Sequence, residues 1–230
     1  MSKILSLISQ VIFFLLINSY LYAHIEHYDK INSLEYELFR NDKKIGFHKY
    51  EFERKNEILT IKSIVEFKIV KLGVVLYKYN ALSEEMYKDN KLFKFSATTN
   101  QNKKKKYANI QYNKQSDEYI IDGSSYKGPS PNDFLVGTWW NHEITNKKAQ
   151  ISAVSGRIIE QKVTFLGDEK VEIDGKTFDT LRYNFSSLKK GVPDKKKLNT
   201  DIWYDKETKL WIKAAFDKTG YWEYRIKIYK

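Results

Sequence analysis

The 230-residue sequence contains no cysteine. Disulfide bonds, cysteine nucleophiles and cysteine metal ligands are therefore excluded from the fold and from any mechanism. A lipid anchor attached through an N-terminal cysteine is excluded for the same reason. Side-chain packing and β pairing must hold the fold together, whichever compartment the protein works in.

Arginine is also scarce. Only five of the 40 basic residues are arginine, against 29 acidic residues, and the net charge is +11. Specific recognition of nucleic acid depends largely on the guanidinium group, so nucleic acid is not expected as a partner. The lysine-rich runs 103–106 and 195–197 are candidates for a weak attraction to an anionic membrane surface, and their alternative role is that of solvated hairpin ends.

The sequence lacks the short motifs of several enzyme classes. It has no Gly-x-Ser-x-Gly nucleophile motif, no His-Glu-x-x-His zinc motif and no glycine-rich phosphate loop, and no cofactor is expected. If the protein is a glycan- or ester-active hydrolase, Glu85 and His142 are the candidate catalytic residues. The alternative is a structural one, in which one carboxylate of the adjacent pair Glu84-Glu85 is buried against Arg182 or Arg225.

Residues 1–23 have the pattern of an export signal. Lys3 gives a basic start, an apolar stretch follows, and Ala23 is a small residue suited to cleavage. Cleavage would leave residues 24–230 as a single domain, and the alternative is that the segment stays in place as a membrane anchor. Either outcome predicts a protein that is periplasmic or secreted through the general export route.

Cleavage after Ala23 would also leave His24 with a free amine beside its imidazole ring. This pair becomes a candidate copper site when another histidine completes it, and His27 or the more distant His48 or His142 could do so. The alternative is that these histidines have no function, as is common near a chain terminus. The sequence predicts no other metal site.

Downstream of residue 33, apolar residues recur at every second position. Leu34, Tyr36 and Leu38 alternate with glutamates, and turn-forming pairs such as Asp174-Gly175 separate such stretches. This pattern predicts an all-β domain made of one strongly curved antiparallel meander sheet, which forms an open or closed barrel with little helix.

One interruption stands out in the middle of the chain. The Gly- and Pro-containing stretch 128–133 breaks the alternation and could divide the sheet into two halves. After it, Asn132 or Asp133 could cap a short helix over residues 134–141.

Short motifs follow one another in order along the chain: Lys44-Ile45-Gly46, Val75-Leu76-Tyr77-Lys78-Tyr79, Ser83-Glu84-Glu85, Lys91-Leu92, Thr98-Thr99-Asn100, Trp140-Asn141, Gly156-Arg157 and Ile202-Trp203-Tyr204-Asp205. Their order and spacing resemble a family of exported proteobacterial, β-rich periplasmic proteins that carries only a domain-of-unknown-function label. Two positions depart from that pattern, because Tyr87 replaces a tryptophan and Gln101 replaces a glycine. The resemblance implies a compartment and an architecture but no reaction.

Aromatic residues are the remaining signal for function. A curved sheet with one apolar face must cover that face by closing, by stacking against a second sheet, or by holding a hydrophobic molecule. We therefore expect a non-catalytic envelope protein that binds or carries a hydrophobic, lipid-like ligand. The alternatives are the hydrolase above and a structural partner of another envelope protein, and the oligomeric state is left open. The candidate ligand-binding residues, each of which could equally belong to an ordinary core, are Tyr77, Tyr79, Trp139, Trp140, Trp203, Trp211 and Trp222.

Overall fold

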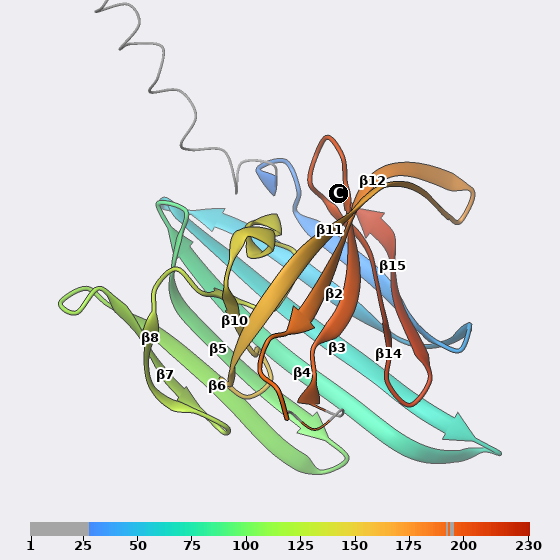
Figure 1. The fold of residues 1–230 in the computed structure, drawn as a ribbon, viewed down its shortest axis with the longest axis horizontal. Coiled ribbons are helices and arrows are strands. Elements are labelled where there is room, and N and C mark those ends of the chain that lie inside the picture. The colour runs from blue at the N-terminus through green and yellow to red at the C-terminus, as the bar shows by residue number, and fades with distance from the viewer. Residues whose placement is uncertain (1–27, 192, 194–195) are drawn as a thin grey trace, which may run out of the picture.

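A computed structural model describes residues 28–191, 193 and 196–230 (Figure 1). The expected export signal, residues 1–23, and the candidate metal ligands His24 and His27 lie outside the described residues. In the part of the chain that is described, no helix is long and apolar enough to cross a membrane.

The described chain forms one sheet of fifteen strands. In chain order they are β1 (Ser33–Arg40), β2 (Lys43–Lys55), β3 (Ile58–Lys71), β4 (Val74–Lys88), β5 (Lys91–Gln101), β6 (Lys104–Asn113), β7 (Glu118–Gly123), β8 (Lys127–Pro131), β9 (Leu135–Val136), β10 (Ala149–Ile151), β11 (Ile158–Ile173), β12 (Lys176–Ser187), β13 (Asn199–Asp205), β14 (Trp211–Asp217) and β15 (Tyr221–Tyr229). The strand order is β8-β7-β6-β5-β4-β3-β2-β1-β15-β14-β13-β12-β11-β10-β9. Neighbours are antiparallel except for the short parallel pair β9 and β10. The predicted all-β antiparallel architecture is confirmed.

Two-residue turns explain why so many neighbouring strands form hairpins. In six of these turns both residues have positive φ, as the right-handed twist of the strands requires. Five begin with asparagine or aspartate, which tolerate this conformation, and the sixth begins with leucine. The six turns are Asn41-Asp42, Asn56-Glu57, Leu72-Gly73, Asp89-Asn90, Asn102-Lys103 and the predicted Asp174-Gly175.

Pairing between the first and last strands joins the two halves of the sheet. Leu38 on β1 lies opposite Tyr224 on β15, so the halves β1–β8 and β9–β15 are continuous. In Figure 1 the orange and red strands of the second half cross over the blue-to-green strands of the first. The core lies between these halves, and Leu34, Tyr36 and Leu38 contribute to it with fully buried side chains.

The two edges of the sheet approach each other without forming a shared ladder. The Ser125 backbone N–H donates a 2.9 Å hydrogen bond to the Ser155 carbonyl, which belongs to the loop between β10 and β11. A Cβ atom at Gly123 would lie 2.5 Å from that same carbonyl oxygen, so the close approach requires glycine. Among the described strands the sheet is therefore an open barrel that a loop contact brings almost to closure.

The predicted helix over residues 134–141 is wrong. This stretch contains β9, which pairs with β10, and the helical turn comes later, as the 3-10 helix η3 (His142–Asn146). Its N-cap is Asn141, whose side chain accepts a 3.0 Å hydrogen bond from the Glu143 N–H. Trp139 has a φ of 63°, which interrupts a right-handed helix, so tertiary contacts override the local helical preference.

Candidate functional site

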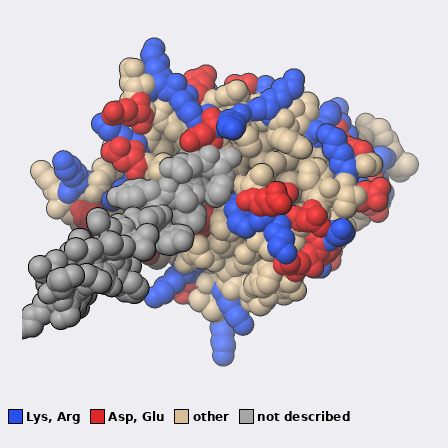
Figure 2. All heavy atoms as spheres, turned by 90° about the horizontal axis from the view of Figure 1, so that it is seen from above, with Lys and Arg blue, Asp and Glu red and all other residues tan. Residues whose placement is uncertain are grey.

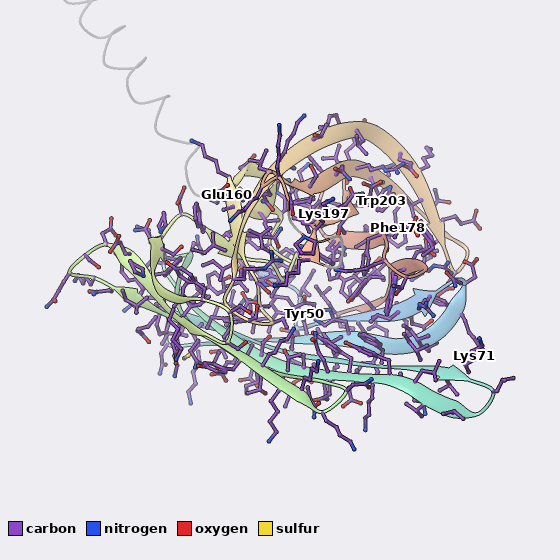
Figure 3. The ribbon with its side chains drawn as sticks, turned by 60° about the horizontal axis from the view of Figure 1, so that its bottom comes forward. Tyr50, Lys71, Glu160, Phe178, Lys197 and Trp203 are labelled. Atoms are coloured by element: carbon purple, nitrogen blue, oxygen red, sulfur yellow. The ribbon has the colours of Figure 1, made fainter. Side chains whose placement is uncertain are left out.

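An inner segment, residues 137–141, crosses the concave side of the sheet and is held from both halves. The Tyr50 hydroxyl on β2 donates a 2.5 Å hydrogen bond to the Thr138 carbonyl. The Tyr204 hydroxyl on β13 donates a 2.9 Å hydrogen bond to the Trp139 carbonyl. Tyr50 lies in the interior, beneath the strands of the second half (Figure 3). These bonds satisfy backbone groups that would otherwise be buried without partners.

Glu85 anchors the inner segment to β4. Its side chain is only 1% exposed, and its carboxylate accepts hydrogen bonds from the Tyr87 hydroxyl at 2.8 Å and from the Trp140 Nε1–H at 3.1 Å. Burial raises the pKa of Glu85 to about 7, and hydrogen bonds from Tyr87, Thr138 and Trp140 lower it in part. Tyr87 is the residue that departs from the family pattern, and sequence reasoning did not assign it this contact.

The predicted pairing of Glu85 with Arg182 or Arg225 is wrong. Arg182 forms ion pairs with Asp201 at 2.5 Å and with Glu169 at 3.1 Å, whereas Arg225 pairs with Glu223. Both arginines project from the face of the sheet opposite to Glu85. A buried carboxylate needs hydrogen-bond donors, and here neutral donors supply them in place of a cation.

The candidate base His142 opens the 3-10 helix and is partly buried. Its ring meets that of Tyr204 edge-on, with 5.3 Å between the centroids, and that of Tyr183 at 6.4 Å. Glu85 is held by Tyr87 and Trp140, while His142 lies against a tyrosine of the other half. The hydrolase role of these two residues stays a hypothesis.

Aromatic rings form two groups, one at the inner segment and one near the β3–β4 hairpin. In the first group, Trp211 stacks on Tyr36 with 4.0 Å between centroids and meets both Trp139 and Tyr224 at 5.6 Å. In the second group, Phe67 stacks on Tyr79 at 4.8 Å. The two groups are neighbours, because burial and the nearby Tyr79 raise the pKa of Tyr224. We call the two groups together the aromatic array, and its members are Phe67, Tyr77, Tyr79, Trp139, Trp211, Trp222 and Tyr224.

Five of the seven predicted ligand-binding residues belong to this array, and two do not. Trp140 meets Tyr28 and Tyr87 edge-on, and its indole N–H donates a hydrogen bond to Glu85. Trp203 lies on the opposite face of β13, between the Arg182 guanidinium at 4.8 Å and the Lys213 ammonium at 5.0 Å. Cation–π packing therefore accounts for Trp203.

In or beside the array, the buried ring nitrogens of three side chains have no hydrogen-bond partner among the described residues. They are His48, with both ring nitrogens, and the indole N–H groups of Trp139 and Trp211. The His48 ring lies 6.1 Å from that of Trp211 and 6.0 Å from that of Tyr224, and burial lowers the pKa of His48 to about 3. Such groups are costly in a core unless a water molecule or a ligand binds them. His48 was not among the predicted ligand-binding residues, although its inward position between Gly46 and Tyr50 follows from the alternation.

A group of basic residues lies at the hairpin end of the array. Desolvation together with the nearby Lys196, Lys104 and Arg157 lowers the pKa of Lys106, and desolvation together with Arg157 lowers that of Lys218. None of these cations forms an ion pair within the described part of the chain. We call these residues the basic cluster: Lys104, Lys106, Arg157, Lys196 and Lys218.

The basic cluster is connected to the aromatic array through the backbone of Lys218 and through Thr99. The Trp222 indole N–H donates a 2.8 Å hydrogen bond to the Lys218 carbonyl. Lys106 lies opposite Thr99 in the ladder between β5 and β6, and the Tyr79 hydroxyl contacts the Thr99 side chain. By contrast, basic and acidic side chains are mixed over the face of the molecule in Figure 2. The cluster is thus a local excess of positive charge beside apolar rings.

A surface depression lies elsewhere. It is formed by the β11–β12 hairpin and the turn after β13, with Phe178, Asp179 and Lys206 among its lining residues. Ion pairs occupy it, namely Lys206 with Asp168 and Lys170 with Asp179. None of the array residues lines it. Among the described residues, no three histidine, aspartate or glutamate side chains gather in a way that could hold a metal ion.

Comparison with known proteins supports the fold and leaves the activity open. A family profile described as Domain of unknown function (DUF6134) matches residues 36–227. No curated protein matches the chain. Among solved structures, the chain is similar to a β-barrel-like protein of domain of unknown function DUF1849 from Brucella abortus, with a TM-score of 0.61 and 10% identity over 87% of this chain and 97% of that chain. The predicted kinship with a domain of unknown function is confirmed, while export and proteobacterial origin stay predictions.

Proposed function

We propose that this chain, which belongs to the family described as Domain of unknown function (DUF6134), binds an anionic, lipid-like molecule and does not catalyse a reaction. The observation that carries the proposal is the proximity of the basic cluster to the aromatic array. Aromatic rings bind an apolar chain, and unpaired cations bind a negative head group. Soluble lipid carriers need both features together, because an amphiphile has both parts.

The unpartnered nitrogens of His48, Trp139 and Trp211 support the same proposal. Two of the three are indole N–H donors, which a carbonyl or ester oxygen of a lipid could satisfy. The neutral His48 ring can offer one donor and one acceptor, because its lowered pKa keeps it uncharged near neutral pH. A bound lipid would thereby remove the cost of these buried groups.

We further propose that the protein acts outside the cytoplasm. The export-signal pattern of residues 1–23 supports this location. An apolar molecule moving through an aqueous compartment needs a protein that covers its chain, which is a role that an open barrel with an aromatic interior suits.

The binding test compares two soluble lysophospholipids below their micelle concentrations. Isothermal titration calorimetry should detect lysophosphatidylglycerol, which is anionic, binding more tightly than zwitterionic lysophosphatidylcholine. The double substitution Arg157→Ala/Lys218→Ala should weaken lysophosphatidylglycerol binding by about tenfold, because two cations near the head group are lost. Lys114→Ala, at an exposed turn at the other end of the sheet, is the matched control.

A second variant separates binding from folding. His48→Phe keeps an aromatic ring but removes both unpartnered nitrogens, so we expect equal or greater stability together with weaker lipid binding. Native mass spectrometry of the protein purified from its own envelope should reveal a bound lipid mass. Two results together would overturn the proposal: neither lysophospholipid binds, and the purified protein carries no added mass.

A further inference from the structure

The end of the β3–β4 hairpin projects beyond the rest of the sheet. Pairing between β2 and β3 ends at Phe67, and pairing between β4 and β5 ends at Tyr79. Residues 68–78 therefore have ladder partners only within their own hairpin. Figure 3 marks this projecting end by Lys71, at the edge of the molecule.

The end of this hairpin is apolar and exposed. Leu72 is 95% exposed, and its apolar neighbours are between 41% and 61% exposed. We call this group the apolar tip, and its members are Val70, Leu72, Val74, Val75 and Leu76. A cluster of large apolar side chains on a surface marks a place of contact with another apolar phase.

The turn itself departs from the pattern of the other hairpins. Leu72 has a φ of 51° and Gly73 a φ of 79°. Leucine is unfavourable in this left-handed region, where the five comparable turns begin with asparagine or aspartate. Neither burial nor turn geometry explains the leucine, so its role lies outside the fold.

Lysines surround the apolar tip, and acidic residues are absent from the adjoining sequence. Residues 67–83 and 90–116 contain neither aspartate nor glutamate. The neighbouring β5–β6 turn lies against the hairpin, because Asn102 donates hydrogen bonds to the Lys78 carbonyl at 2.9 Å and to the Leu76 carbonyl at 3.1 Å. The lysines of the two hairpin ends are Lys68, Lys71, Lys78, Lys103, Lys104 and Lys105.

We propose that the apolar tip inserts into the surface of a lipid bilayer that contains anionic lipids. The leucine and valine side chains enter the boundary between head groups and acyl chains, while the surrounding lysines contact lipid phosphates. The charge around the tip favours this occupant over a second copy of the chain, whose tip would carry the same positive charge. This inference does not depend on lipid binding in the aromatic array.

Vesicle co-sedimentation tests the inference. Wild-type protein should bind vesicles of phosphatidylcholine mixed with phosphatidylglycerol, and should bind vesicles of phosphatidylcholine alone more weakly. Added salt should reduce the difference. Leu72→Asn should weaken binding to the mixed vesicles by about tenfold, because it removes one large apolar side chain from the insertion. Leu166→Asn, at a residue that is 50% exposed on β11, is the matched control.

Weaker vesicle binding by Leu72→Asn should not result from misfolding. It creates an Asn-Gly turn, the pair favoured for this geometry, so its unfolding midpoint should equal or exceed that of the wild type. Equal vesicle binding by the two proteins would overturn the inference. So would wild-type self-association that Leu72→Asn abolishes without any vesicle binding, since the tip would then join two copies. Unchanged lysophosphatidylglycerol binding by Leu72→Asn would separate this site from the proposed ligand site.

Discussion

Substitution of Glu85 by glutamine tests the electrostatics at the centre of the molecule. Burial raises the pKa of Glu85 from 4.5 to about 7, while in the unfolded chain the carboxyl keeps its ordinary value. Between these two values the folded protein binds more protons than the unfolded protein. Glu85 therefore makes its full contribution to the free energy of unfolding at low pH. This contribution is lost as pH rises through about 7.

The magnitude follows from the size of the shift. A difference of about 2.5 pKa units corresponds to about 3 kcal/mol. Glutamine cannot ionise, yet its oxygen can accept from the Trp140 N–H and its amide can donate to the Tyr87 hydroxyl. As pH rises from acidic to mildly alkaline, the free energy of unfolding of Glu85→Gln should therefore increase by about 3 kcal/mol relative to that of the wild type.

Urea unfolding followed by tryptophan fluorescence measures this difference at a series of pH values. Glu84→Gln is the matched control, because Glu84 precedes Glu85 on β4 and its side chain points to the opposite face. We expect the control to change the free energy of unfolding by less than about 0.5 kcal/mol. Parallel stability curves for Glu85→Gln and the wild type across the whole pH range would contradict a raised pKa of Glu85.

Three further predictions concern the inner segment, the closure of the barrel and the N-terminus. Tyr50→Phe leaves the Thr138 carbonyl without its donor and should lower the free energy of unfolding by about 1–3 kcal/mol in urea; a smaller loss would mean that water replaces the hydroxyl. Gly123→Ala brings a methyl group against the Ser155 carbonyl and should cost about 1–3 kcal/mol, with faster amide exchange of the loop between β10 and β11; unchanged exchange would contradict the close contact. A C-terminally tagged protein should be recovered outside the cytoplasm with an intact mass that begins after Ala23, and a full-length cytosolic product would contradict the export prediction.

Local sequence determined most of the strand architecture. Alternation of apolar and polar residues depends only on the two-residue period of a strand, so Leu34, Tyr36 and Leu38 could be assigned to one buried face. Turn pairs such as Asp174-Gly175 carry their own conformational preference, so hairpins between neighbouring strands also follow from the sequence.

The candidate site depended on contacts between residues far apart in the chain. The pairing of β1 with β15 and the placement of residues 137–141 across the concave side join segments whose sequences carry no sign of each other. The predicted arginine partner of Glu85 was wrong for the same reason. In the folded protein, Trp140 and Tyr87 donate hydrogen bonds to its buried carboxylate.

Which side chains face inward and where the chain turns could thus be predicted, since these properties depend on residues close to one another. Long-range contacts set which inward side chains meet, place Trp203 apart from the other aromatic residues, and put the exposed Leu72 among lysines of two hairpins. Sheet curvature and the β1–β15 pairing fix those distances, and neither is encoded in a short stretch of chain.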